Sequence, residues 1–342
     1  MTHYKLALIG FGNVGRSFAR LLQRKEAELK DQYGLSFTIT TIATGHHGTA
    51  LNPHGVDVEN ALKLVETGQS LSTLSAQPAP AELLELIRTC GADVLFENSP
   101  VNYQTGQPAI EHLRTALECG MYAITANKGP VVHAYRSLTE LARSKGRKFF
   151  FESTVMDGAP IFSLFRGTLP AARLLSFRGV LNSTTNLILT RMENGESFEE
   201  AVKYAQKVGV AETDPSGDID GWDASVKVAA LATVLMDTPL KPADVDRQGI
   251  RQITSEEISR AKAAGKRWKL VCSARRTGQG LQAKVAPELV GMDSPMYSVE
   301  GTTSIIQFET DVLGLLSVVE SDPGPDTTAY GLLADFINAV IH

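Results

Sequence analysis

Apolar and polar residues alternate along the first part of the chain with the spacings of strands and helices. Residues 4–9 (YKLALI) form a short apolar run, residues 10–15 are rich in glycine, and the next stretch repeats apolar residues every three or four positions. We predict a strand, a tight turn and a helix, with a second strand at the β-branched run 37–44. Further strands and helices are predicted at 93–97, 110–119, 122–125 and 134–144. This order is typical of an α/β fold with a doubly wound parallel sheet.

The pattern changes near residue 150, and a length of 342 residues favours two domains. A strand-like FFFES segment and a loop, MDGAP, are followed by longer helical stretches and then by short strands separated by turns. We therefore predict a second, α+β domain from about residue 151 onwards. Its helices are predicted at 198–207 and 222–236, its strands at 270–274, 281–285 and 304–308, and a final helix at 329–340 after a loop at 321–326.

Composition narrows the class of protein. Hydrophobic residues make up 43% and charged residues 21% of the chain, as in folded globular proteins. The net charge of −5 and the lack of a Lys/Arg run argue against nucleic acid, so we expect a small-molecule partner. Three scattered cysteines without a C-x-x-C spacing predict a cytoplasmic protein without a disulfide framework or a zinc site. No apolar stretch is long enough for a membrane span or a signal peptide.

The glycine-rich turn GFGNVG predicts a dinucleotide site. Gly10 allows the sharp turn out of the strand, Gly12 lets the backbone approach a pyrophosphate, and Gly15 lets the helix pack closely on the sheet. After the second strand, where an NAD site usually offers Asp or Glu, residues 43–47 read ATGHH. Without that carboxylate a 2′-phosphate is not repelled, and Arg16 supplies a nearby cation. We expect NADP, with NAD as the alternative.

The segment ETDPSGDIDGWDASVK at 212–227 places five carboxylates before one lysine. One explanation is structural: Asp220 caps the helix, acids favour its first turn, and Asp223 and Lys227 form an ordinary i, i+4 ion pair worth about 0.2–0.5 kcal/mol. The other is catalytic, because Lys227 lies where the helix becomes apolar, and a partly buried lysine needs a partner. The residues alone leave both explanations open.

Six segments taken together resemble homoserine dehydrogenases, in the order of that family. They are GFGNVG, ITANKGPVV, FESTVMDGAPI, GVLNSTTNLILTRM, ETDPSGDIDGWDASVK and TAYGLLADFI. The resemblance implies a Rossmann-type domain at 1–150 and 323–342 and a catalytic and dimerisation domain at 151–322, in a homodimer. It implies the reversible NAD(P)-dependent reduction of L-aspartate 4-semialdehyde to L-homoserine, on the branch to threonine, methionine and isoleucine. It also implies a short form without the C-terminal regulatory module of longer relatives.

The resemblance carries over roles residue by residue. Catalytic roles fall on Lys227, Lys128 and Asp223, and substrate contacts on Glu212, Asp218 and Thr184. Cofactor contacts fall on Gly10, Phe11, Gly12, Asn13, Val14, Gly15, Ser99, Lys128 and Gly324. A sodium-like monovalent cation is expected on the backbone carbonyls of Glu152, Val155, Asp157 and Ala159.

Two segments depart from the family pattern. VMDGAP replaces the commoner VGAGLP or VGGGIP around the expected cation loop, and Ser183 replaces a glycine in LNSTTN. A glycine there would let the backbone approach the substrate closely. Two other functions therefore stay open at this point: a dehydrogenase for another amino-acid semialdehyde, and a non-catalytic dinucleotide sensor, which would need the glycine turn but not the acidic segment and its lysine.

Overall fold

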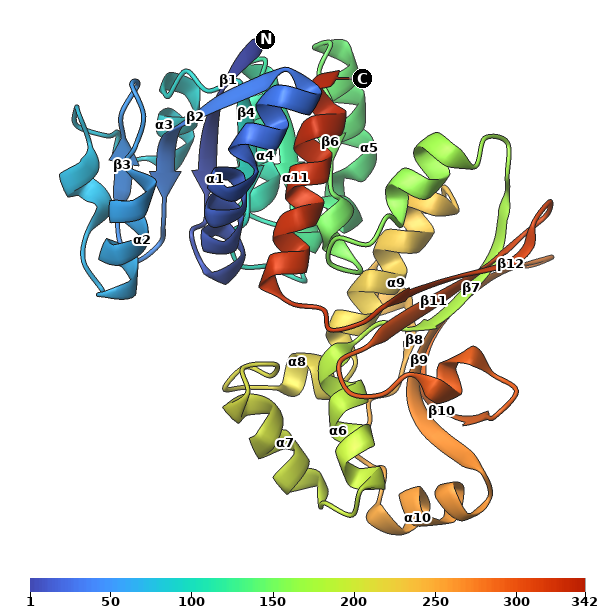
Figure 1. Ribbon diagram of the computed structural model, residues 1–342. Coiled ribbons are helices and arrows are strands. Elements are labelled where there is room, and N and C mark those ends of the chain that lie inside the picture. The colour runs from blue at the N-terminus through green and yellow to red at the C-terminus, as the bar shows by residue number, and fades with distance from the viewer. Residues whose placement is uncertain (342) are drawn as a thin grey trace. The chain divides into compact units, whose positions relative to one another are not determined.

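The chain divides into two units in the computed structural model, which describes residues 1–341 (Figure 1). The first unit comprises Met1–Pro160 with the described residues from Gly324 onwards, and the second comprises Ile161–Pro323. His342, where the predicted segment 323–342 ends, lies outside the described residues.

The boundary after residue 160 lies ten residues beyond the one expected from sequence. Segment 151–160 stays with the first unit because it is hydrogen-bonded to the helix that ends the chain. The Glu152 N–H donates to Asp335 Oδ2 (2.7 Å), and the Ser153 hydroxyl donates to the Thr328 carbonyl (2.8 Å). A Cβ on Gly158 would lie 3.0 Å from the Gly331 nitrogen, so the two backbones pack directly together.

A six-stranded sheet in the order β3-β2-β1-β4-β5-β6 forms the centre of the first unit. All its pairings are parallel except that of β2 with β3. Because β1 lies between β2 and β4, the strand order reverses there, and the carboxyl ends of β1 and β4 are where such a fold binds its ligand. The strands are β1 (Thr2–Ile9), β2 (Leu35–Ala43), β3 (Thr49–Leu51), β4 (Val94–Glu97), β5 (Tyr122–Thr125) and β6 (Phe149–Phe150).

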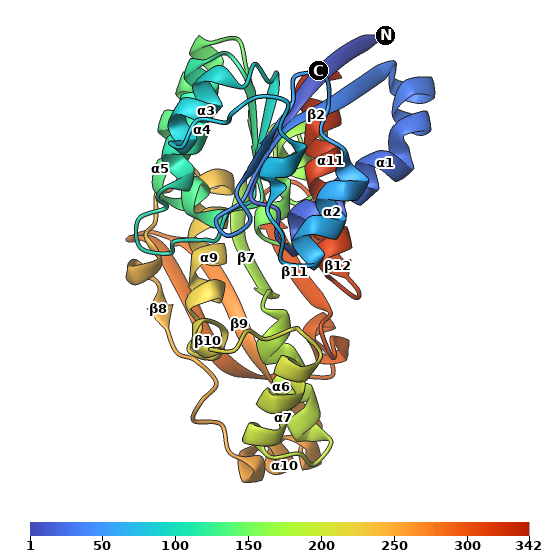
Figure 2. The same cartoon turned by 90° about the vertical axis from the view of Figure 1, so that its left-hand side faces the viewer.

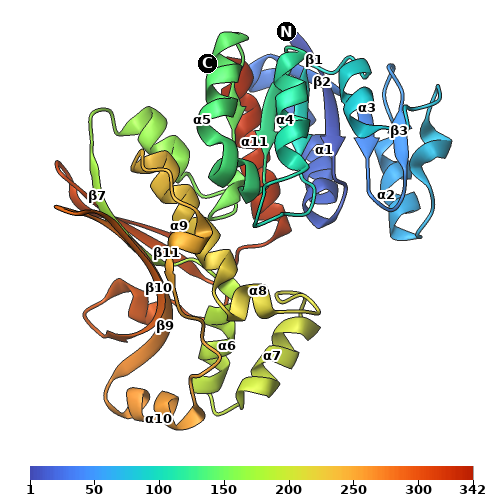
Figure 3. The same cartoon turned by 180° about the vertical axis from the view of Figure 1, so that it is seen from behind.

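Helices cover both faces of this sheet. Figure 1 shows α1 (Asn13–Tyr33) beside α11 (Pro325–Ile341), and Figure 3 shows α4 (Ala109–Glu118) and α5 (Lys128–Ser144) side by side on the opposite face. The remaining helices are α2 (Val58–Glu66) and α3 (Leu83–Thr89), with a short 3₁₀ turn at Leu71–Leu74 and another at Glu152–Thr154.

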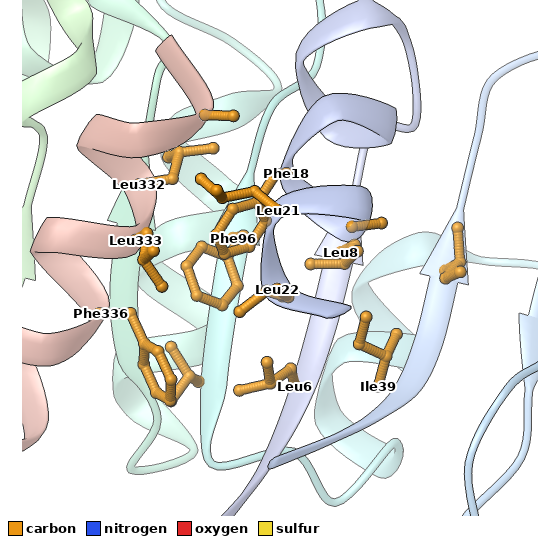
Figure 4. Packing of buried hydrophobic residues seen from close by; sticks show 14 of the residues in the cluster. Leu6, Leu8, Phe18, Leu21, Leu22, Ile39, Phe96, Leu332, Leu333 and Phe336 are labelled. Carbon is orange, nitrogen blue, oxygen red and sulfur yellow. The ribbon is translucent and has the colours of Figure 1, made fainter. Parts of the chain in front are cut away.

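The core of the first unit joins residues from both ends of the sequence (Figure 4). Phe18 from α1 lies 4.5 Å from the Phe96 ring of β4, and Phe96 lies 6.0 Å from Phe336 of α11. All three rings are fully buried. At ~25 cal/mol per Å² of apolar surface removed from water, each contributes about 1.5–3 kcal/mol. The last helix is therefore a structural part of the first unit.

Two helices begin earlier than the sequence suggested. Helix α5 starts at Lys128 rather than 134, because the Asn127 side chain caps it by accepting from the Gly129 N–H (2.9 Å). Helix α11 starts at Pro325 rather than 329. A proline in the first turn costs no hydrogen bond, since N–H groups there have no partner within the helix.

The second unit is a six-stranded sheet in the order β12-β11-β7-β9-β10-β8, antiparallel except for the pairing of β8 with β10. Its strands are β7 (Leu174–Val180), β8 (Asp246–Arg247), β9 (Lys266–Thr277), β10 (Gly280–Gly291), β11 (Ser304–Thr310) and β12 (Gly314–Glu320).

Five α-helices belong to the second unit, besides a π-helix at Leu164–Thr168 and 3₁₀ turns at Pro242–Asp244 and Pro295–Ser298. Helices α6 (Ser183–Glu193) and α9 (Trp222–Leu235) contact β9, and Figure 2 shows α6, α7 (Phe198–Lys207) and α10 (Ser255–Ala263) gathered at one end of the unit. The short helix α8 (Ser216–Ile219) precedes α9. Helix α9 is buried on nearly all sides, because its residues beyond Asp223 are almost entirely apolar. None of the helices in the described part of the chain has the length and apolarity needed to cross a membrane.

Candidate active site

The glycine turn of the first unit has the close packing that its sequence requires. Gly10 has a φ of +91°, and a Cβ there would lie 2.5 Å from the Asn98 carbonyl carbon. A Cβ on Gly15 would lie 2.5 Å from the Gly10 oxygen, whereas one on Gly12 would meet nothing within 4 Å. Gly10 and Gly15 are therefore fixed by packing, and Gly12 leaves open space at the start of α1. An anion is favoured at such a helix start.

The residues next to this turn are packed or hydrogen-bonded within the first unit. Phe11 is buried, and no side chain caps the start of α1 at Gly12. The Arg16 guanidinium donates to Asn13 Oδ1 (2.8 Å). The turn after β2 is closed by the Thr44 hydroxyl, which accepts from the His47 N–H (2.7 Å).

Gly324 and the expected cation loop are joined within the first unit. The Gly324 N–H donates to Thr327 Oγ1 (2.8 Å), and the same hydroxyl lies 3.1 Å from Asp157 Oδ2. Asp157 has a φ of +41°, a strained value for a residue with a side chain. The carboxylate of Asp157 is thus engaged with the start of α11, which leaves backbone oxygens as the expected donors of this loop.

In the second unit, the five carboxylates of the acidic segment have different surroundings. Asp214 accepts from the Ser216 N–H (3.0 Å), and Asp220 is paired with Arg251 (2.8 Å). These two bonds lower the pKa of both carboxyl groups below their usual value. The expected cap was wrong: Gly221, with a φ of +80°, precedes α9, and no side chain caps it. Asp214 and Asp220 are therefore explained by local structure.

Lys227 and Asp223 form a largely buried ion pair on α9. Their side chains are 13% and 11% exposed, and Lys227 Nζ lies 3.3 Å from Asp223 Oδ2. The Lys227 ammonium also donates to the carbonyl of Leu181 (2.6 Å), the residue that directly follows β7. A surface pair contributes little, but this ammonium is largely buried and is held by groups from two segments.

Asn182 joins this pair to Asp218. Its Nδ2 donates to Asp218 Oδ1 (2.7 Å) and to Asp223 Oδ2 (3.0 Å). Its Oδ1 accepts from the N–H and the hydroxyl of Thr185 (2.9 and 2.8 Å), which caps α6. Every hydrogen-bonding position of the amide is used, so its orientation is fixed.

The pKa of Asp218 is raised by burial and by the neighbouring Asp223 carboxylate, against the opposing effect of its bonds to Asn182 and Thr184. Thr184 also donates to the Val210 carbonyl (3.2 Å). Glu212 lies in the preceding loop and is exposed, with its carbonyl 3.3 Å from Gln206 Nε2. The structure thus brings together Asp218, Asp223, Lys227 and Thr184, whereas no hydrogen bond or ion pair joins the exposed Glu212 carboxylate to them in the described part of the chain.

Comparison with known proteins places both units in one family. The family model "Homoserine dehydrogenase, NAD binding domain" matches residues 10–152, and the model "Homoserine dehydrogenase" matches residues 160–337. The chain is 36% identical to the NAD(+)-dependent homoserine dehydrogenase of Pseudomonas canavaninivorans, over 99% of this chain and 96% of that protein. It is also 36% identical to the homoserine dehydrogenase of Methanocaldococcus jannaschii, over 97% of each. The chain belongs to the homoserine dehydrogenase family.

Solved structures agree with this assignment. A hyperthermophilic archaeal homoserine dehydrogenase in complex with NADPH matches 99% of this chain and 98% of its own, with a TM-score of 0.83 at 28% identity. The chain is accordingly an NAD(P)-dependent oxidoreductase that interconverts L-aspartate 4-semialdehyde and L-homoserine, with a Rossmann-type first unit. A sensor without catalysis and a different semialdehyde as the main substrate do not fit this membership.

Two polar residues, Asn182 and Glu97, were not among the site residues expected from the sequence. Asn182 stands before a run of Ser and Thr, a typical cap position, and this signal predicted a helix start but not a link between two carboxylates. Glu97 was interpreted only as the last residue of a strand, yet it is fully buried. A charged residue type at the end of a central parallel strand was the available signal.

Burial raises the pKa of the Cys272 thiol, on β9, to about 12. The charges of Lys227 and Asp223 have smaller effects on this pKa. A thiol with such a pKa is not a nucleophile near neutral pH. The chemistry of the site is therefore that of an ammonium between carboxylates, which suits proton transfer and charge stabilisation.

Proposed function

We propose that Lys227, with Asp223 beside it and Lys128 from the first unit, carries the proton transfer that accompanies hydride transfer. Hydride addition to the aldehyde carbon of aspartate semialdehyde leaves an alkoxide, which needs a positive charge and then a proton. The Lys227 ammonium is fixed by the Leu181 carbonyl and Asp223, and this fixed position supports the proposal. The nicotinamide supplies or accepts the hydride.

We further propose that Asp218, Glu212 and Thr184 bind the amino-acid end of the substrate. A substrate ammonium needs carboxylate partners, and Asp218 and Thr184 lie beside the lysine pair. The exposed position of Glu212 leaves its carboxylate free to take up a substrate group from solvent. Ser183, where relatives commonly have glycine, starts α6 next to Asn182 and is the position most relevant to the choice among amino alcohols.

The test is the Lys227→Ala variant, assayed by absorbance of the reduced nicotinamide with homoserine as substrate. We expect kcat to fall by about 10²–10⁴-fold, the usual loss for a general acid–base, while cofactor affinity stays within about twofold. Lys203→Ala is the matched control, because Lys203 is exposed on α7 away from this cluster. Equal losses of turnover and cofactor affinity would point away from a catalytic role.

We propose NADP as the preferred cofactor. The turn at 44–48 carries no carboxylate against a 2′-phosphate, and Arg16 lies at the start of α1. NAD is the second candidate, because one relative is named as NAD(+)-dependent. The ratio of kcat/KM for NADPH and NADH decides between them, and Arg16→Ala should lower that ratio if Arg16 meets the phosphate.

We propose a sodium-like cation on the carbonyls of Glu152, Val155, Asp157 and Ala159, which share one loop of the first unit with an acidic side chain nearby. Oxygen donors suit a hard cation. A rise in the unfolding temperature with sodium chloride but not with choline chloride at equal ionic strength would support it, and equal curves would contradict it.

We propose a homodimer that pairs through the sheet of the second unit. On the edge strand β12, Leu315 and Val319 lie on the same face of the sheet, and they are 70% and 56% exposed. Exposed apolar residues on an edge strand favour association. Light scattering should give twice the chain mass, and Leu315→Glu should give the monomer. Tyr33→Glu, in the first unit, is the control.

Cytoplasmic location stays a prediction from the cysteine pattern.

A further inference from the structure

Glu97 is a fully buried acidic residue at the ligand-binding edge of the first unit's sheet. It ends β4, where it is paired with Ile9 of β1 on one side and with Thr125 of β5 on the other. This is the place where the strand order reverses. Burial of a carboxyl group is costly unless its oxygens are hydrogen-bonded, so its partners show what it holds.

Polar groups from three segments surround the Glu97 carboxyl group. Oε1 accepts from both the N–H (3.2 Å) and the hydroxyl of Ser99, and it lies 3.4 Å from His112 Nδ1. The Thr125 hydroxyl donates to the Glu97 backbone carbonyl (2.8 Å), and it also lies 3.3 Å from Oε2. His112 and Thr125 are themselves buried. The carboxyl group is therefore the common anchor of the segment after β4, the end of β5 and helix α4.

These bonds extend to the glycine turn and to the start of α5. The Ser99 nitrogen would lie 2.8 Å from a Cβ on Gly10, so the segment after β4 packs directly on the turn. The Thr125 hydroxyl accepts from the Asn127 N–H (2.9 Å), and the Asn127 amide donates to the Ser99 carbonyl (3.1 Å). Asn127 caps α5, whose first residue is Lys128.

We propose that Glu97 is a positioning residue for the nicotinamide end of the cofactor. It touches neither cofactor nor substrate. It fixes the backbone and hydroxyl of Ser99 and, through Thr125 and Asn127, the position of Lys128. A site that is ordered before binding loses less conformational entropy when the ligand binds. The ordering of Ser99 and Lys128 by Glu97 therefore increases the affinity for the cofactor. The inference rests on the proposed cofactor contacts of Ser99 and Lys128.

The experiment is a double-mutant cycle on the full-length protein, with Glu97→Gln, Ser99→Ala and the double variant. Dissociation constants are measured from the fluorescence of the reduced cofactor that the enzyme prefers. A fragment with the adenosine and its phosphate but no nicotinamide is measured in competition. We expect Glu97→Gln to weaken the cofactor about tenfold and the fragment less than twofold. In the Ser99→Ala background, Glu97→Gln should raise the dissociation constant of the cofactor by less than a further threefold, because the two side chains act through the same hydrogen bond.

The control is Asp93→Asn, just before the other end of the same strand. Asp93 also accepts a backbone N–H, from Lys5 at 2.7 Å, but it lies away from the ligand edge and should leave cofactor affinity unchanged. If Glu97→Gln does not fold, Thr125→Val removes the hydroxyl that joins Glu97 to the Asn127 N–H, and its cofactor and fragment affinities decide by the same comparison.

Three results would overturn the inference: unchanged cofactor affinity in Glu97→Gln, an equal loss for cofactor and fragment, or full additivity with Ser99→Ala. The last two would show a general structural role. The Ser99→Ala variant by itself separates the proposed cofactor contact of Ser99 from the positioning role of Glu97. If it binds cofactor normally, the proposed contact of Ser99 fails; if it binds weakly while Glu97→Gln binds normally, only the role of Glu97 fails.

Discussion

Replacing Asn182 by aspartate tests whether its amide holds the two carboxylates of the site in place. Aspartate has the same shape, and it is as good a helix cap as asparagine, so the bond from the Thr185 N–H to Oδ1 is kept. The change removes the two N–H donors and places a third carboxylate where Asp218 and Asp223 lie 2.7 and 3.0 Å from Nδ2.

The size of the effect follows from these two bonds. A hydrogen bond to a charged group contributes about 1.5–3 kcal/mol, so the loss of both removes about 3–6 kcal/mol of local interaction. If half of this loss, about 1.5–3 kcal/mol, is felt in the transition state, kcat with homoserine falls roughly 10- to 150-fold at pH 8. The deficit should shrink as pH falls, because protonation of the introduced carboxyl group restores a donor and removes the repulsive charge.

The assay is a pH profile of kcat and kcat/KM for wild type, Asn182→Asp and Asn182→Ser. Serine keeps the cap without adding a charge, and it is too short to reach both carboxylates. It should therefore lose activity by about tenfold at every pH. Activity of Asn182→Asp within threefold of wild type at pH 8, or a deficit of the same size at all pH values, would refute the reasoning.

Three further predictions concern stability and reactivity. The raised pKa of Asp218 means that its contribution to stability is present at low pH and lost as pH rises through that pKa. Asp218→Asn should thus stabilise the protein by about 1 kcal/mol near neutral pH, which raises the unfolding temperature by roughly 2–4 °C, although activity falls. Below about pH 4 the variant should show no such gain, and a gain that persists in acid would contradict this. In native protein at pH 8, a thiol reagent should modify Cys119 quickly and spare Cys90 and Cys272, whose pKa values burial raises; rapid modification of more than one thiol would be the contrary result. Phe336→Ala should cost about 3–5 kcal/mol and lower the unfolding transition of the first unit, seen by calorimetry; an unchanged transition would exclude α11 from that core.

Local patterns predicted much of the fold. The strand, glycine turn and helix at the start of the chain were found because each depends on residues within a few positions of one another. Helix α7 was predicted with its observed bounds, 198–207, from its helical spacing, and in the structure Ser197 and Glu200 form a capping box at its start. Helices α2 and α3 were missed, since runs of nine and seven residues give too few turns to show a period.

The site was predictable only where its partners are close in sequence. Asp223 and Lys227 are four residues apart, and their pairing followed from helical spacing. Asn182 lies 36 and 41 residues from its two carboxylate partners, and only the folded chain brings them together. The start of α5 was missed because Gly129 and Pro130 suggest a break, whereas the Asn127 cap makes a helix start there.

Helix α11 has a consequence for how the protein is made. Its residues leave the ribosome after those of the whole second unit, yet Phe336 and its neighbours complete a core begun by α1. Domains usually fold in order during translation, but here the continuous stretch Ile161–Pro323 has all its own strands before the N-terminal unit has its final helix. The first unit of a nascent chain therefore stays without part of its core until α11 has been synthesised, after the second unit.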